Sequence, residues 1–297
     1  MGPAPPYLLD PSASVTVEAD PESTVALLTV HGTWDQCLGQ AAATALRHCL
    51  AEHPGALIVD LSALDDPAAH SAAVWTDAQR TAAAMQPPVQ LALCVPPEMI
   101  LADRLQRLGA RRFLPVYARV RQARVAVSGR LPMTERLVLA LGAEPDASAL
   151  AGSVVAGACA AWRLDTLLNR GRTVVAELVG NAVRHGEPPI TVVVSRRTGG
   201  LHRSGGLHGS GGLHRSDGLH GSDGLHGSDG LHLAVADTSP RRARLSGPDG
   251  PGRGLHAVHR AATAWGALPT ATGKVVWATL HPDGPPVRTD DPATGPR

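Results

Sequence analysis

Three glycines stand directly before a predicted helix, an arrangement whose chemistry is anion binding. They are Gly250, Gly252 and Gly254 in the segment GPDGPGRGLHAV, with Arg253 between the last two. Glycines at such a turn let backbone N–H groups approach a phosphate, and the N-terminus of the following helix favours negative charge. Glycine turns also precede many ordinary helices, so the feature indicates a phosphate site only together with others.

A carboxylate and an amide are predicted to share one face of another helix. The segment VVAELVGNAVRHG contains Glu177 and Asn181. Because the two residues are four positions apart, their side chains lie on the same side of a helix. The residues available for packing are Leu178, Val179, Ala182 and Val183. The alternative is that Glu177 and Asn181 belong to the solvated face of an ordinary helix.

An aspartate ends a predicted strand between these two segments. The sequence LAVADTSP places Asp237 at the C-terminal end of the strand, before the turn pair Ser239-Pro240. An ionised carboxylate only accepts hydrogen bonds, so it suits an amine donor. An aspartate ending a strand is more commonly a turn or cap residue.

Taken in order, these segments resemble the boxes of the GHKL ATPase superfamily and, within it, the anti-sigma-factor serine kinases. ELVGNAVRHG is similar to the N box, LAVADTSP to the G1 box and GPDGPGRGLHAV to the G2 lid. The closing segment TGKVVWATL is similar to the last strand of that family, so the resemblance covers residues 131–283. Two positions depart from the family pattern: Val275 stands where relatives often have threonine, and no glycine follows Asp237.

The resemblance implies ATP and Mg²⁺ as cofactors and gives each position a role. Asn181 would hold Mg²⁺ against the ATP phosphates, and Glu177 would be the base that polarises the attacking hydroxyl. Asp237 would accept a hydrogen bond from the adenine amino group. The residues that would surround the phosphates are Gly252, Arg253 and Gly254.

Strands and helices alternate through the first part of the chain. The predicted elements are two strands within residues 14–30, a helix at 36–51, a buried strand at 55–61, a helix at 69–85, a strand at 89–95 and a helix at 99–108. This alternation predicts an α/β unit over residues 13–124. The segments ALIVDLSALDD, QLALCVPP and RLGARRFLPVYARV resemble a STAS domain, the anti-sigma antagonist module that such kinases bind and phosphorylate.

One serine lies near the position that is phosphorylated in STAS antagonists. There the antagonists have a DSSG-like turn, whereas this chain has PAAHSAAVW, with Ser71 as the only hydroxyl. The aspartate and glycine of the turn are missing, which favours a helix-capping or first-turn serine over a phosphosite. The sequence therefore predicts a degenerate, regulatory STAS-like module.

The second part of the chain mixes strands and helices without strict alternation. The predicted elements are a strand at 135–141, a helix from about 146, a helix at 167–184, strands at 190–195 and 231–236, a helix at 254–265 and a strand at 274–280. This order predicts an α+β fold, and the resemblance specifies a Bergerat-type sandwich over residues 131–283. A leader at 1–12 and a tail at 284–297 are predicted to be disordered, with a linker at 125–130.

A six-residue repeat interrupts the second part between two strands. It spans residues 199–232, with histidines at His202, His208, His214, His220, His226 and His232. Three interpretations stay open: an inert loop expansion, a metal-binding histidine tract and a small hexapeptide solenoid.

The balance of charges argues against nucleic acid and acidic membranes as direct partners. Twenty-seven basic and 26 acidic residues give a net charge of +1, without a long single-sign block. The four cysteines, Cys37, Cys49, Cys94 and Cys159, lie far apart, which disfavours disulfides and structural zinc. No signal peptide or membrane-spanning stretch is evident, so we expect a cytoplasmic protein.

These features predict a bacterial regulatory protein that transfers the ATP γ-phosphoryl group to a protein serine. Its expected partners are a sigma factor, a STAS-type antagonist or both, and the resemblance is compatible with a homodimer. The alternative is a non-catalytic, nucleotide-binding interaction protein in a partner-switching pathway.

Overall fold

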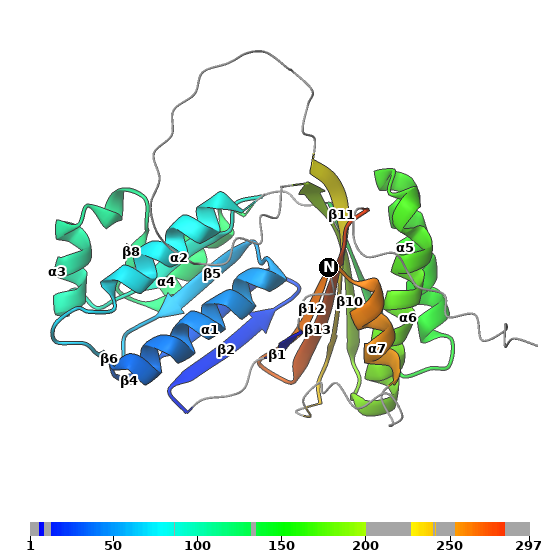
Figure 1. Ribbon diagram of the computed structural model, residues 1–297. Helices are drawn as coiled ribbons and strands as arrows, with labels where there is room; N and C mark the ends of the chain where they lie inside the picture. Colours follow the sequence, from blue (N-terminus) through cyan, green and yellow to red (C-terminus); the bar gives the residue numbers. More distant parts are fainter. Residues whose placement is uncertain are drawn as a thin grey trace, which may run out of the picture.

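The computed structural model describes residues 6–8, 13–85, 87–131, 135–199, 227–239, 241 and 253–282. It has a mixed α/β architecture in which each half of the chain forms its own sheet (Figure 1). None of the helices in the described ranges is long and apolar enough to cross a bilayer.

The first half forms a five-stranded sheet in the order β2-β3-β5-β7-β8. Its strands are β2 (Val15–Asp20), β3 (Val25–Val30), β5 (Ala56–Asp60), β7 (Gln90–Cys94) and β8 (Val116–Tyr117). Only β2 runs antiparallel to its neighbour, and the other pairs are parallel. A separate parallel pair joins β4 (Gly32–Thr33) to β6 (Leu64–Asp65).

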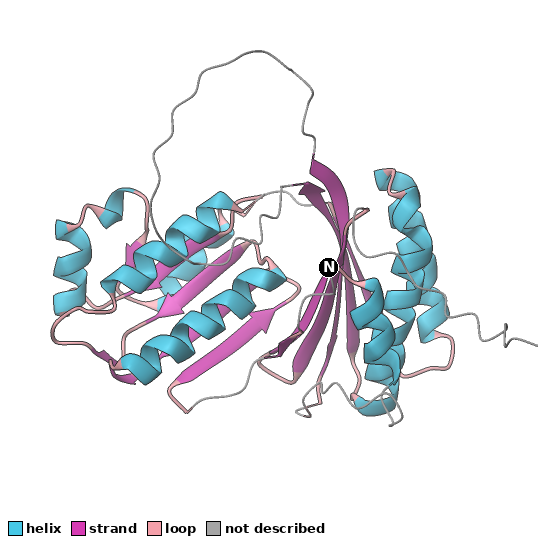
Figure 2. Cartoon of the chain, viewed as in Figure 1, coloured by secondary structure: helices cyan, strands magenta, loops and turns pink. Residues whose placement is uncertain are grey.

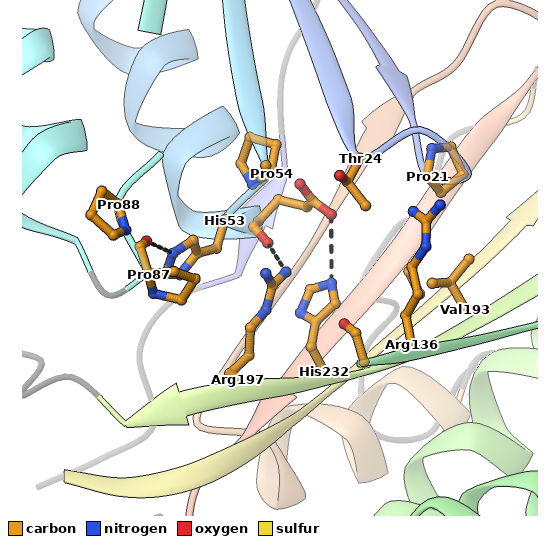
Figure 3. A pocket seen from close by; sticks show the side chains of 14 residues that line it. Pro21, Thr24, His53, Pro54, Pro87, Pro88, Arg136, Val193, Arg197 and His232 are labelled. Carbon is orange, nitrogen blue, oxygen red and sulfur yellow. Dashed lines mark hydrogen bonds and ion pairs between the residues drawn. The ribbon is translucent and has the colours of Figure 1, made fainter. Parts of the chain in front are cut away.

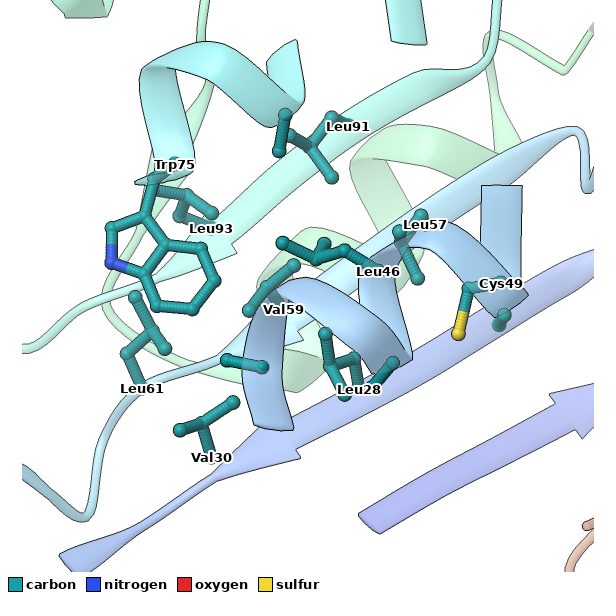
Figure 4. Close-up of a cluster of buried hydrophobic side chains, with 14 of the residues drawn as sticks. Leu28, Val30, Leu46, Cys49, Leu57, Val59, Leu61, Trp75, Leu91 and Leu93 are labelled. Carbon is teal, nitrogen blue, oxygen red and sulfur yellow. The ribbon is translucent and has the colours of Figure 1, made fainter. Parts of the chain in front are cut away.

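Helices cover this sheet and close its core. They are α1 (Gln36–Glu52), α2 (Ala72–Ala84), α3 (Ile100–Arg107) and α4 (Val120–Ser128), with a short 3-10 helix η1 at Ala110–Arg112. Asp35 caps α1, because its carboxylate accepts a 2.7 Å hydrogen bond from Leu38 N. The side chains in Figure 4 come from α1, α2 and the central strands and are completely or almost completely buried. The alternation predicted from the sequence is thus confirmed.

One helix of this half lies partly where the sequence predicted a linker. Residues 125–128 form the last turn of α4. Ala123 and Val127 are four residues apart and pack with Ile58 and Ala92 of the sheet. The linker prediction was wrong for these residues because that packing stabilises a helix whose local sequence gives a weak signal.

The second half and the N-terminal residues Tyr7–Leu8 together form a six-stranded sheet in the order β1-β12-β13-β11-β10-β9. Its strands are β1 (Tyr7–Leu8), β9 (Arg136–Leu141), β10 (Ile190–Gly199), β11 (Gly227–Asp237), β12 (Ala264–Pro269) and β13 (Lys274–Leu280). All neighbours are antiparallel except β1, which runs parallel to β12. Tyr7 and Leu8 were predicted to belong to a disordered leader, and their pairing with β12 corrects that.

Three helices cover one face of this second sheet (Figure 2). They are α5 (Ala147–Trp162), α6 (Leu168–His185) and α7 (Arg253–Ala261), with a short 3-10 helix η2 at Asp165–Leu167. Side chains alternate along the strands, so Val192 and Val194 pack with the helices whereas Val193 belongs to a different cluster on the other face.

The predicted helix at 254–265 is shorter in the structure. It ends at Ala261, and Trp265 lies in β12. The indole of Trp265 is 1% exposed and donates a 3.0 Å hydrogen bond from Nε1 to Nδ1 of His259 on α7. Residues 264–269 form a strand because they pair with β13. The local sequence pattern does not reveal that pairing.

The first half packs on the face of the second sheet that the helices leave open. Trp277, Val275 and Ala234 of that face share one buried cluster with residues of the first half. Tyr7 stacks on Trp277, with ring centroids 5.9 Å apart, and meets His48 of α1 edge-on at 5.6 Å. The second sheet therefore stands between the first half of the chain and helices α5–α7 (Figure 1).

Polar groups meet at one end of this junction (Figure 3). His232 on β11 points its Nε2 at the Glu52 carboxylate, 3.5 Å away, and its Nδ1 lies 2.9 Å from Thr279 Oγ1. Arg197 on β10 donates a 3.1 Å hydrogen bond to the Glu52 carbonyl at the end of α1. A cavity of about 30 Å³ lies among these residues. The junction thus ties the end of α1 to β10 and β11 of the second sheet.

Part of the predicted repeat insertion is strand rather than loop. β11 begins at Gly227, so the last hexad contributes backbone pairs with β10 and β13. His232, one of the six repeat histidines, is 2% exposed and belongs to the junction. Residues 200–226 and the other five histidines lie outside the described residues, as do residues 1–5, 9–12 and the tail from 283.

Candidate functional site

Helix α6 carries Glu177 and Asn181 and packs between α5 and α7. Its buried residues include Val174, Leu178 and Ala182, which pack in the core between the helices and the second sheet. Glu177 and Asn181 are each half-buried. The predicted amphipathic helix, with both polar groups off its apolar face, is therefore present.

Helix α7 lies antiparallel to α6, and this orientation places its first turn against Glu177. Arg170, near the start of α6, donates hydrogen bonds of 3.2 and 2.6 Å to the carbonyl of Ala261, the last residue of α7. Seven residues further along α6, a Cβ atom placed on Gly254 would lie 2.5 Å from Oε2 of Glu177. A side chain at position 254 would therefore force the Glu177 carboxylate to shift.

The surroundings of Glu177 are electropositive. The first turn of α7 carries free backbone N–H groups and the positive end of the helix dipole. Arg184 folds back along α6, and its Nη2 would be 3.5 Å from a Cβ atom on Gly254. Arg184 and the start of α7 thus place positive charge beside Glu177, which favours a negatively charged group there. The sequence motif contained Arg184, but no role was predicted for it.

Asp237 ends β11 and is 3% exposed. Its Oδ1 accepts two hydrogen bonds, one of 2.9 Å from the Ser239 backbone N–H and one of 2.7 Å from Lys274 Nζ. It lies beside the end of α6, because a Cβ atom on Gly186 would be 2.8 Å from Asp237 Cγ. Asp237 thus makes the turn contact expected of an aspartate that ends a strand. It also forms a buried ion pair with Lys274 that the sequence did not predict.

The predicted site residues gather on one face of the second sheet. Asp237 lies against the C-terminal end of α6, one turn beyond Asn181, and Glu177 lies against Gly254. Gly250, Gly252 and the side chain of Arg253 fall outside the described residues. The described part of the site therefore contains a carboxylate and an amide on α6, a helix N-terminus on α7 and a carboxylate on β11.

Ser71 lies far from this arrangement in the fold. It is the residue before α2, is fully buried and makes no capping hydrogen bond. Asp66 instead accepts the backbone N–H groups of His70 and Ser71, each at 2.9 Å. The predicted position at the start of a helix is confirmed, because Ser71 is the N-cap residue of α2, but its hydroxyl does not make the predicted capping hydrogen bond.

Comparisons with known proteins find similarities among solved structures. No protein-family model matches the sequence, and no curated protein matches it. The chain is similar to the crystal structure of an anti-sigma factor antagonist from Mycobacterium paratuberculosis, with 20% identity and a TM-score of 0.33. That match covers 40% of this chain and 98% of the antagonist. A match at this TM-score does not establish a shared fold, so the functional proposal rests on the site residues.

Proposed function

We propose that the second half binds Mg·ATP and transfers its γ-phosphoryl group to a serine of a partner protein, as in anti-sigma-factor serine kinases. The observation that carries the proposal is the placement of Glu177, Asn181 and Asp237. Glu177 and Asn181 lie on α6, which covers one face of the second sheet, and Asp237 at the end of β11 belongs to that same face although it is far from the other two in sequence. In the family that the sequence resembles, the general base, the metal ligand and the carboxylate that binds adenine follow one another along the chain in this order, which supports the proposal.

The phosphate end of the site fits this role. A helix N-terminus at Gly254 and the guanidinium of Arg184 supply positive charge beside Glu177. The Asn181 amide oxygen is a hard ligand of the kind that Mg²⁺ prefers. Bound Mg²⁺ would neutralise phosphate charge, which is the main requirement of phosphoryl transfer. Glu177 would accept the proton of the serine hydroxyl, and the packing of α6 holds it in place.

The partners that we propose are a sigma factor and a STAS-type antagonist protein. The first half of the chain carries the sequence segments that resemble such an antagonist, and it is joined to the second half by a shared core. The first half would then act as a fixed regulatory module, while a separate protein supplies the serine.

Asn181→Ala is expected to weaken Mg·ATP binding by about 10- to 100-fold, the range seen when the ligand environment of a bound metal is damaged. Calorimetric titration with ATP, in the presence and absence of Mg²⁺, measures the change. Asn169→Ala is the matched control, because Asn169 is exposed near the start of the same helix. Unchanged Mg²⁺ dependence in Asn181→Ala would place the metal elsewhere.

Ser71 is expected to carry no phosphate after the protein is incubated with Mg·ATP. Its hydroxyl is buried, and the second sheet stands between its half of the chain and Glu177. In-line transfer requires the hydroxyl to reach the γ-phosphate. Mass spectrometry of the full chain tests this. A stoichiometric phosphate on Ser71 that disappears in Glu177→Gln would instead establish phosphorylation within the chain.

The same experiments separate the alternative function. Mg·ATP binding without phosphate transfer to any STAS-type antagonist would leave a nucleotide-dependent interaction protein. Absence of ATP binding in the parent and in every variant would contradict both functions.

A further inference from the structure

The only lysine of the sequence is buried in the candidate site. Lys274 is 6% exposed and begins β13, directly opposite Asp237 at the end of β11. Residues opposite each other on neighbouring strands point to the same face of the sheet. The two side chains form an ion pair with 2.7 Å between Lys274 Nζ and Asp237 Oδ1.

The surrounding backbone holds this pair tightly. A Cβ atom on Gly186 would lie 2.8 Å from Asp237 Cγ, and one on Gly273 would collide with the carbonyl oxygen of Asp237. The next residue, Thr238, is fixed by a 3.1 Å hydrogen bond from its backbone N–H to the Glu187 carbonyl. The carboxylate therefore has little freedom to turn away from the ammonium group.

The choice of lysine at this position is chemically specific. All other cationic side chains that are permanently charged in this protein are arginines. An ammonium group is a compact donor on a flexible stem, whereas a guanidinium is broad and rigid. An ammonium can occupy the space of a single amino group, and burying it is costly unless a partner such as Asp237 compensates its charge.

We propose that Lys274 is an internal competitor for the base of the nucleotide, so that the ammonium closes the base site until ATP displaces it. The inference rests on the proposed function, in which Asp237 accepts a hydrogen bond from the adenine amino group. In the structure, Oδ1 accepts a bond of that kind from Lys274. Part of the binding free energy of ATP is then used to break the ion pair, which lowers the affinity for ATP and sets the threshold at which the site fills.

Lys274→Met tests the competition directly, because methionine keeps the length of the side chain and removes its charge. The affinity for Mg·ATP is expected to rise by at least about tenfold, since a charge-assisted hydrogen bond no longer has to be broken. Lys274→Arg keeps the charge and is expected to bind no more tightly than the parent. Arg80→Met, which removes an exposed positive charge on α2, is the control for net charge.

A measurement on the unaltered protein covers the case in which Lys274→Met does not fold. Because the sequence has one lysine, an amine-acetylating reagent modifies only Lys274 and the chain N-terminus, which mass spectrometry distinguishes. Acetylation of Lys274 is expected to be slow in the nucleotide-free protein and faster with saturating Mg·ATP. Mg²⁺ alone should leave the rate unchanged.

The outcomes separate the competition from the proposed function. Suppose that the parent binds ATP. If Lys274→Met then binds ATP no more tightly than the parent, or if ATP slows the acetylation of Lys274, the competition is wrong but ATP binding stands. If Lys274→Met binds ATP and the parent does not, both are supported. If neither binds ATP and ATP leaves acetylation unchanged, the proposed function fails and the competition fails with it.

Discussion

Glu177→Gln is expected to lower phosphoryl transfer to a STAS-type antagonist protein by about 10²- to 10⁴-fold, the usual cost of losing a general base. Glutamine keeps the shape of the side chain and its hydrogen-bonding capacity but does not accept a proton at neutral pH. The affinity for Mg·ATP should change little, because the carboxylate is proposed to act on the hydroxyl rather than to hold the nucleotide. Single-turnover transfer of labelled phosphate, with ATP saturating, measures the rate.

The surroundings of Glu177 define the controls for this experiment. The carboxylate lies against Gly254 at the first turn of α7, so its removal also changes charge at a helix N-terminus. Gly254→Ala displaces the same carboxylate without removing it, and it should also lower the rate. Glu98→Gln removes an exposed carboxylate from the first half and should leave the rate unchanged. Equal rates in Glu177→Gln and the parent would exclude Glu177 as the base.

The elements with strong local patterns were predicted from the sequence. The strand at Ala56–Asp60 reads as a continuous apolar run because helices cover both faces of its sheet. Helix α6 has apolar residues at helical spacing, so its polar residues Glu177 and Asn181 were placed on the correct side. In both cases the spacing of apolar residues along one segment indicates which of its side chains are buried.

The missed elements depend on partners that are distant in the sequence. Tyr7 and Leu8 form a strand only because β12 lies beside them, more than 250 residues further along the chain. Lys274 meets Asp237 because β13 pairs with β11 in one register, and neither strand encodes that register locally. Likewise, the hexad that contains His232 has loop composition, yet its pairing with β10 and β13 makes it strand.

The junction between the two halves leads to a prediction about acid stability. His232 is 2% exposed and lies between the Glu52 carboxylate on α1 and Arg197 on β10. Its other neighbours are the Thr279 hydroxyl and the stacked ring of Trp277. Burial, together with the charge of Arg197, lowers the pKa of His232 from 6.5 to about 4, although Glu52 opposes that shift. His53 at the end of α1 has its pKa lowered to about 4 by the same two causes.

These lowered pKa values make the folded protein less stable in acid. When the protein unfolds, both histidines return to their ordinary pKa near 6.5 and bind protons more readily than in the folded state. The contribution of the two neutral, buried histidines to the free energy of unfolding is therefore fully present above about pH 6.5. It is lost as the pH falls toward 4. For His232 alone, the shift corresponds to a loss on the order of 3 kcal/mol.

The free energy of unfolding is therefore expected to fall steeply between pH 6.5 and pH 4, and His232→Gln should flatten that fall. Glutamine is neutral at every pH in this range and retains hydrogen-bonding groups for Glu52 and Thr279. Urea denaturation at pH 7.5, 6.5, 5.5 and 4.5, followed by tryptophan fluorescence, suits the measurement because Trp277 lies at the junction. His70→Gln, at an exposed position, should retain the pH dependence of the parent. If His232→Gln loses as much stability on acidification as the parent, proton binding by His232 does not contribute to the fall.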